Sequence, residues 1–143
     1  MKRIAALLAL ALTFGLPHAP AWSGTSAPIA EDRVDWQAHP VRLLMVTRVG
    51  CIYCAAWDRE IAPGFAASSE GRAAPLLRVD IDGPWPDGIA LARRPTITPT
   101  FIVLRDGAEA ARLEGYPGEN FFYAVLDEIM EDAGVFADKK ETQ

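Results

Sequence analysis

Two cysteines, Cys51 and Cys54, lie three positions apart and are the only cysteines of this 143-residue chain. A disulfide between them would close a loop so short that the loop-entropy model assigns it about 1.9 kcal/mol, which argues against a purely structural cross-link. Structural zinc needs four ligands, whereas the chain has no second cysteine pair and only two histidines. A two-thiolate copper(I) site stays open, because soft thiolates select that ion. The spacing best fits a pair that forms and breaks its disulfide.

Helical periodicity places both cysteines at the start of a helix. The apolar stripe that follows them consists of Trp57, Ile61 and Phe65. Side chains at positions i and i+3 of a helix are neighbours about 5–6 Å apart, close to the range that a disulfide accepts. Cys51 would lie at the helix N-terminus, where unpaired N–H groups stabilise a thiolate and lower its pKa from about 8.5. Cys54 would face the core, so we expect Cys51 to attack and Cys54 to resolve the mixed disulfide.

The other elements predict an α/β fold. Short apolar runs indicate strands over residues 41–47, 76–81, 100–105 and 109–113. A first helix is predicted over 52–69, broken at Pro63, and a second over 117–135. The expected apolar face of the second helix contains Phe121, Phe122, Val125, Leu126 and Ile129. The alternation of strands and helices in the first part of the fold favours a parallel βαβ unit, and the turn signal Asp106-Gly107 favours an antiparallel hairpin. We expect a small mixed four-stranded sheet flanked by helices on both faces.

A Cys-x-x-Cys pair that opens a helix after a strand resembles the thioredoxin-like family. Thr98 and Pro99, directly before the strand at 100–105, match the family's cis-proline and the residue that pairs with the substrate backbone. The resemblance covers residues 36–136. It implies a thiol–disulfide oxidoreductase of the protein disulfide reductase type, with no cofactor beyond its cysteines. It also implies that Cys51 and Cys54 are catalytic and that Thr98 and Pro99 bind substrate.

The chain departs from thioredoxins in an informative way. Thioredoxins carry a buried acid six residues before the first cysteine as a proton acceptor, and Met45 occupies that position. Asp58 and Glu60, which follow Cys54 on the helix, are the alternatives. The stretches around the cysteines and "GYPGENFF" most resemble the SoxS-type periplasmic thioredoxins of bacterial sulfur-oxidation systems, which implies a reductant. Two other functions stay open: a disulfide-forming oxidase or isomerase with the same site, and a non-catalytic binding or copper-chaperone module.

The N-terminus has the three-part layout of a secretory signal peptide. Lys2 and Arg3 precede an apolar run over residues 4–16, and a small-x-small site predicts cleavage after Ala21. The apolar run is shorter than the ~20 residues that span a bilayer, although an uncleaved signal would serve as an anchor. We therefore predict four parts. These are a signal peptide at 1–21, a flexible lead at 22–35, a thioredoxin-like domain at 36–136 and a polar tail at 137–143.

The predicted export signal and the net charge indicate which partners to expect. Export predicts the periplasm, where disulfides persist, with no stable membrane insertion once the signal is cut. The net charge is -5 and no basic block occurs, which argues against nucleic acid. The expected partner is a client protein with a disulfide or reactive cysteine. A membrane electron donor would recharge the cysteine pair, and we expect a monomer.

Overall fold

The computed structural model describes residues 34–136. The predicted signal peptide, most of the predicted lead and the polar tail lie outside the described residues. The elements follow the chain in the order β1 (Val41–Thr47), α1 (Ile52–Glu60), α2 (Ala62–Phe65), α3 (Ser69–Ala73), β2 (Leu76–Asp80), β3 (Thr100–Arg105), β4 (Ala108–Glu114) and α4 (Glu119–Asp132).

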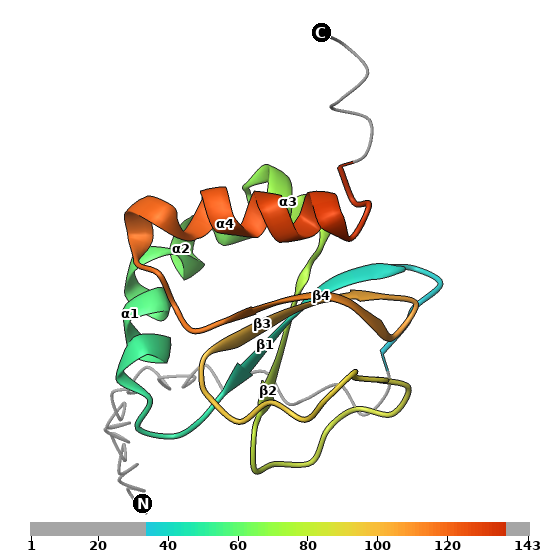
Figure 1. Ribbon diagram of the computed structural model, residues 1–143, viewed down its shortest axis with the longest axis horizontal. Coiled ribbons are helices and arrows are strands. Elements are labelled where there is room, and N and C mark those ends of the chain that lie inside the picture. Colours follow the sequence, from blue (N-terminus) through green and yellow to red (C-terminus); the bar gives the residue numbers. More distant parts are fainter. Residues whose placement is uncertain (1–33, 137–143) are drawn as a thin grey trace, which may run out of the picture.

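The strands form one mixed sheet in the order β2-β1-β3-β4 (Figure 1). β1 and β2 run parallel, and β3 runs antiparallel to both β1 and β4. Asp106 and Gly107 close the β3–β4 hairpin with φ angles of 48° and 85°, which is the left-handed backbone that a tight two-residue hairpin turn requires. The predicted four-stranded mixed sheet and its hairpin are confirmed.

One face of the sheet carries the helices. Alternation along β1 directs Leu43 and Met45 to this face, where α1, α2 and α4 supply Trp57, Phe65 and Phe122. Aromatic rings fill the space between the layers, and those of Phe101 and Phe122 lie 5.0 Å apart. Pro63 breaks the predicted helix at 52–69, because α1 ends before it and α2 begins with it in the first turn.

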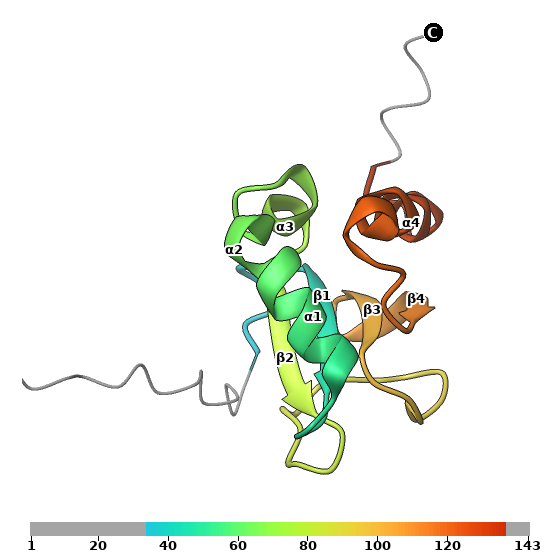
Figure 2. The same ribbon diagram turned by 90° about the vertical axis from the view of Figure 1, so that its left-hand side faces the viewer.

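The opposite face corrects the expectation of helices on both sides. Within residues 34–136, no helix packs on Leu44 and Val46; the irregular segment 82–97 crosses that face instead (Figures 1 and 2). Its apolar side chains and one from the N-terminal region cover the sheet: Trp36, Trp85, Ile89 and Leu91. Three prolines in the segment, Pro84, Pro86 and Pro95, explain why it forms no helix.

No helix within the described residues has the length and apolar composition needed to cross a bilayer.

Candidate active site

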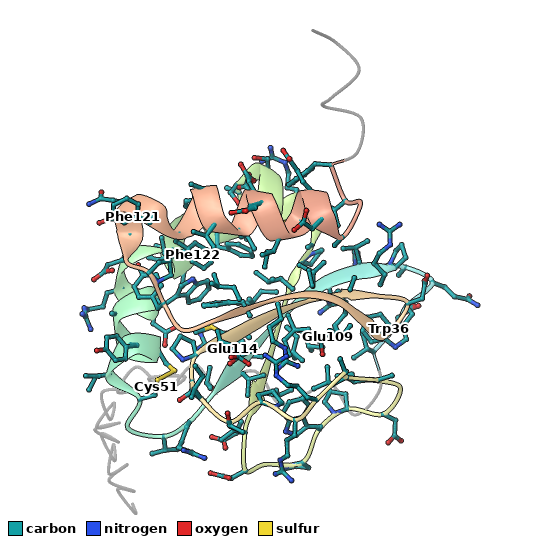
Figure 3. All side chains as sticks on the ribbon, in the orientation of Figure 1. Trp36, Cys51, Glu109, Glu114, Phe121 and Phe122 are labelled. Atoms are coloured by element: carbon teal, nitrogen blue, oxygen red, sulfur yellow. A yellow bond between two sulfur atoms is a disulfide. The ribbon has the colours of Figure 1, made fainter. Side chains whose placement is uncertain are left out.

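Cys51 and Cys54 form a disulfide at the N-terminus of α1, with their Cα atoms 5.3 Å apart (Figure 3). Cys51 is the N-cap residue, and its Sγ accepts the backbone N–H of Cys54 at 3.1 Å. Gly50 precedes it with a φ of +78°, so the chain can turn sharply from β1 into the helix. A sulfur at this cap occupies the position where a serine or aspartate oxygen normally satisfies the first helical N–H groups.

The two sulfur atoms have different surroundings. Cys51 is half-buried at the surface, whereas Cys54 is only 5% exposed. Cys54 belongs to the apolar core that also contains Met45, Trp57 and Phe101. The predicted difference between an accessible first cysteine and a shielded second one is therefore present in the geometry.

Thr98 and Pro99 lie at the same end of the sheet as the cysteines. The register pairs Val46 with Thr100, so the end of β1 that leads to Cys51 lies beside the start of β3. The Thr98–Pro99 peptide bond is cis. The carbonyl of Pro99 accepts the N–H of Gly115 at 2.8 Å. The backbone N–H and C=O of Thr98 have no hydrogen-bond partner within residues 34–136.

A solvent-open hollow of about 530 Å³ adjoins the disulfide. Both cysteines line it, together with side chains from the β1–α1 turn, α1 and β2. Its charged lining residues are Arg48, Asp58, Arg78 and Asp80. Arg78 comes from β2 and was not anticipated from the sequence. The sequence feature that could have indicated it is a charged residue between Leu77 and Val79, two apolar and buried residues of one strand.

Of the two acids predicted as proton acceptors, only Asp58 lines this hollow. Arg78 binds its carboxylate through two hydrogen bonds, of 2.6 Å and 3.2 Å. Glu60 instead accepts a hydrogen bond of 2.7 Å from the phenol of Tyr116. The structure therefore separates the two candidates.

Large apolar side chains are exposed around the disulfide, and sequence reasoning missed most of them. Val49 is 92% exposed, Ile52 is 72% exposed and Tyr53 is 58% exposed, all next to the cysteines in the chain. Ile97, directly before Thr98, is 46% exposed. For Val49 and Ile97 the available sequence signal was an apolar residue in an irregular segment, where no regular element can bury it; Ile52 and Tyr53 lie in the first turn of α1.

No group of three or more metal-binding side chains occurs within the described part of the chain.

No protein-family model and no curated protein sequence matches the chain. Among solved structures, it is similar to the reduced form of the periplasmic thioredoxin SoxS from Paracoccus pantotrophus, with 49% identity and a TM-score of 0.63. That match covers 65% of this chain and 98% of the other. The thioredoxin Mala s 13 from Malassezia sympodialis is 18% identical with a TM-score of 0.42, over 64% of this chain and 76% of the other.

A mixed four-stranded sheet with a Cys-x-x-Cys disulfide at the start of α1 defines a thioredoxin-like thiol–disulfide oxidoreductase. At 49% identity over nearly the whole of the SoxS structure, the chain belongs to the thioredoxin family. The predicted thioredoxin-like α/β fold with a mixed four-stranded sheet and the predicted enzyme class are both confirmed; only the helices expected on the second face of the sheet are absent within residues 34–136.

Proposed function

We infer that this chain reduces disulfides in client proteins, with Cys51 as the attacking nucleophile and Cys54 as the resolving cysteine. The observation that carries the assignment is the asymmetry of the pair. The sulfur of Cys51 caps α1 and accepts an N–H, whereas Cys54 is buried one turn inside. A thiolate on Cys51 would strengthen that hydrogen bond and would benefit from the positive end of the helix dipole.

The reaction is exchange through a mixed disulfide. In the reduced protein, the Cys51 thiolate attacks one sulfur of a client disulfide, and the other client sulfur leaves as a thiolate. Cys54 then attacks the sulfur of Cys51, which re-forms the Cys51–Cys54 disulfide and releases the second client sulfur. Two electrons pass from the dithiol to the client, whose two thiolates each take up one proton.

The client binds as an extended segment. The unpaired N–H and C=O of Thr98 would form strand-like hydrogen bonds with the client backbone beside its disulfide. Pro99 would hold this segment toward Cys51. The exposed apolar side chains of Val49, Ile52 and Ile97 would contact apolar client residues on either side of the cysteine.

The compartment we propose is the periplasm. The signal peptide predicted at residues 1–21 supports export, and the 49% identity with a periplasmic thioredoxin supports the same location. Each turnover leaves the Cys51–Cys54 pair oxidised, so an electron donor in the membrane would have to return it to the dithiol. The protein would act as a monomer.

A trapping experiment tests the cysteine roles. Reduced Cys54→Ser protein is mixed with insulin, whose chains are joined by disulfides. We expect a covalent adduct through Cys51 that dithiothreitol dissolves, no adduct with Cys51→Ser, and turnover without accumulation for the wild type. Failure of Cys54→Ser to form the adduct would exclude the exchange mechanism.

The direction of electron flow is tested separately. The Cys51–Cys54 pair is equilibrated with glutathione buffers, and the reduction potential is read from the fraction of dithiol. A reductant is expected near the value of about -270 mV that is typical of thioredoxin. A value near about -120 mV would instead assign a disulfide-forming oxidant.

A further inference from the structure

Resolution of the mixed disulfide requires Cys54 to lose a proton. Cys54 is only 5% exposed and is packed among apolar side chains, which disfavour a thiolate. Met45, buried in the same core, has a thioether that takes up no proton near neutral pH. The hollow, which Cys54 lines together with charged side chains, offers this proton a route to solvent.

Asp58 is one helical turn beyond Cys54 on the wall of that hollow. Residues at positions i and i+4 of a helix have Cβ atoms about 5–6 Å apart, so a single water molecule can connect the thiol and the carboxylate. Arg78 fixes the carboxylate by its two hydrogen bonds, and the Arg78 guanidinium lies 5.7 Å from the centre of the Trp57 ring. A carboxylate has about four lone-pair sites, so the pair with Arg78 leaves sites for a proton.

We propose that Asp58, held by Arg78, accepts the proton of the Cys54 thiol through solvent in the hollow and returns it when Cys54 leaves as a thiolate. This role rests on the resolving function proposed for Cys54. In this proposal the proton acceptor of the exchange lies on α1, and the residue that orients it lies on β2, the strand parallel to β1.

The other charged groups around the hollow lie outside α1, the helix that carries Cys54. Arg48, in the turn after β1, pairs with Asp82 at 3.1 Å. Asp80, on β2, accepts the backbone N–H of Asp82 at 2.8 Å and follows Arg78 by two residues. Neither lies on the helix that carries Cys54, whereas Asp58 shares the helix and the face.

The proton and electron changes balance. In the mixed disulfide, the Cys54 thiol transfers its proton to the Asp58 carboxylate, and its sulfur attacks the sulfur of Cys51. The bond between Cys51 and the client breaks, and the client leaves as a thiolate. Asp58 then gives its proton to that thiolate through solvent, so it ends each cycle ionised. When a donor reduces the disulfide, the same steps run in reverse.

The step can be observed with Ellman's reagent and reduced protein in a stopped-flow instrument. Cys51 releases a first thionitrobenzoate as it forms the mixed disulfide, and Cys54 releases a second as it resolves it. We expect Asp58→Asn to slow the second release at least about tenfold at pH 7 and to leave the first release within about twofold. The difference in the rate of the second release between Asp58→Asn and the wild type should shrink above about pH 9, where hydroxide ionises the Cys54 thiol without the carboxylate.

Matched variants separate the alternatives. Asp58→Glu keeps a carboxylate and should restore most of the second rate. Glu60→Gln removes a carboxylate from the same helix outside the hollow and should leave both rates unchanged. If Asp58 acted only by its negative charge, Asp58→Asn would favour the Cys54 thiolate and accelerate the second release. An accelerated or unchanged second release with Asp58→Asn would overturn the proposal.

The same stopped-flow traces distinguish a failure of the proposed function from a failure of the role proposed for Asp58. Cys54→Ser must lose the second release while keeping the first. Should Cys54→Ser retain both, Cys54 is not the resolving cysteine and the function falls together with the role of Asp58. Should Cys54→Ser lose the second release while Asp58→Asn keeps the wild-type rate, only the role of Asp58 falls.

Discussion

The phenol oxygen of Tyr116 lies 2.7 Å from Oε2 of Glu60, and this hydrogen bond joins the last turn of α1 to the loop before α4. Burial is the main cause that raises the pKa of Tyr116 above its ordinary value. The carboxylate of Glu60 raises it further, by accepting the hydrogen bond and by its negative charge. The folded protein therefore favours the neutral phenol.

The first prediction concerns Tyr116→Phe. Removing the hydroxyl should lower the free energy of unfolding by about 1 kcal/mol at pH 7. Because the folded pKa is raised, the contribution of Tyr116 is fully present below about pH 10, its unfolded value, and is lost as pH rises further. Urea denaturation at pH 7 and at pH 10.5 should show a smaller difference between the two proteins at the higher pH. Tyr53→Phe, at an exposed ring, is the control, and a constant difference would contradict the linkage.

The second prediction concerns Gly107 in the β3–β4 turn. A Cβ atom built at this residue would lie 2.1 Å from the carbonyl oxygen of Gly88, and the φ of Gly107 is +85°. Gly107→Ala should therefore displace the segment near Gly88 and lower the free energy of unfolding by about 3 kcal/mol. At Gly64, in α2, a Cβ meets no heavy atom within 4 Å, so Gly64→Ala should be neutral or slightly stabilising. Equal urea midpoints for the two variants would show that the turn adapts at no cost.

Local patterns in the sequence were sufficient for the elements that hold the cysteines. The strands predicted at 41–47 and 100–105 have the observed bounds, because each is a short apolar run with both faces buried. Pro63 and the Asp106-Gly107 turn act through backbone geometry that is independent of the rest of the fold. The position of the cysteines at a helix start follows from the same local reasoning.

Features that depend on distant contacts were not predictable. The Asp58–Arg78 pair joins residues 20 positions apart, and only the parallel register of β1 and β2 brings them together. The face of α4 was misjudged for a related reason: Phe122 points to the sheet, whereas Phe121 is 64% exposed (Figure 3). A nearly continuous apolar run does not determine which side of the helix faces the sheet, and the packing of Phe122 against Trp57 decides it.

The third prediction concerns the exposed apolar surface beside Thr98. If it contacts clients, Ile97→Asp should lower kcat/KM for insulin reduction about tenfold, because one contact at the centre of an interface contributes more than about 1 kcal/mol. The rate with Ellman's reagent, which is too small to span this surface, should change less than about twofold. Ile97→Leu keeps the apolar area and should retain the insulin rate. An equal loss with both substrates would indicate damage to the cysteine site instead.

A cluster of charges on β4 holds the segment that leads to Thr98. Arg112, whose side chain is 6% exposed, binds Glu109 at 2.7 Å and Glu114 at 3.2 Å and donates to the carbonyl of Arg93 at 2.8 Å. Glu109 also accepts the N–H of Ala92 at 2.9 Å. Burial by itself would raise the pKa of Glu109, but the bonds from Arg112 and Ala92 outweigh it and lower the pKa below its ordinary value.

The fourth prediction is that Arg112→Gln lowers the free energy of unfolding by about 3 kcal/mol near pH 7, because Glu109 stays buried without its cation. The stability that Glu109 supplies is present above about pH 4.3, its unfolded pKa, and is lost as pH falls toward the lower folded value. Urea denaturation at pH 7 and at pH 3.5 should therefore show the gap between wild type and variant narrowing in acid. Arg93→Gln removes a cation that is 64% exposed and should cost less than about 1 kcal/mol. A gap that persists unchanged at pH 3.5 would mean that Arg112 acts by packing its stem against β4 and not through the carboxylate.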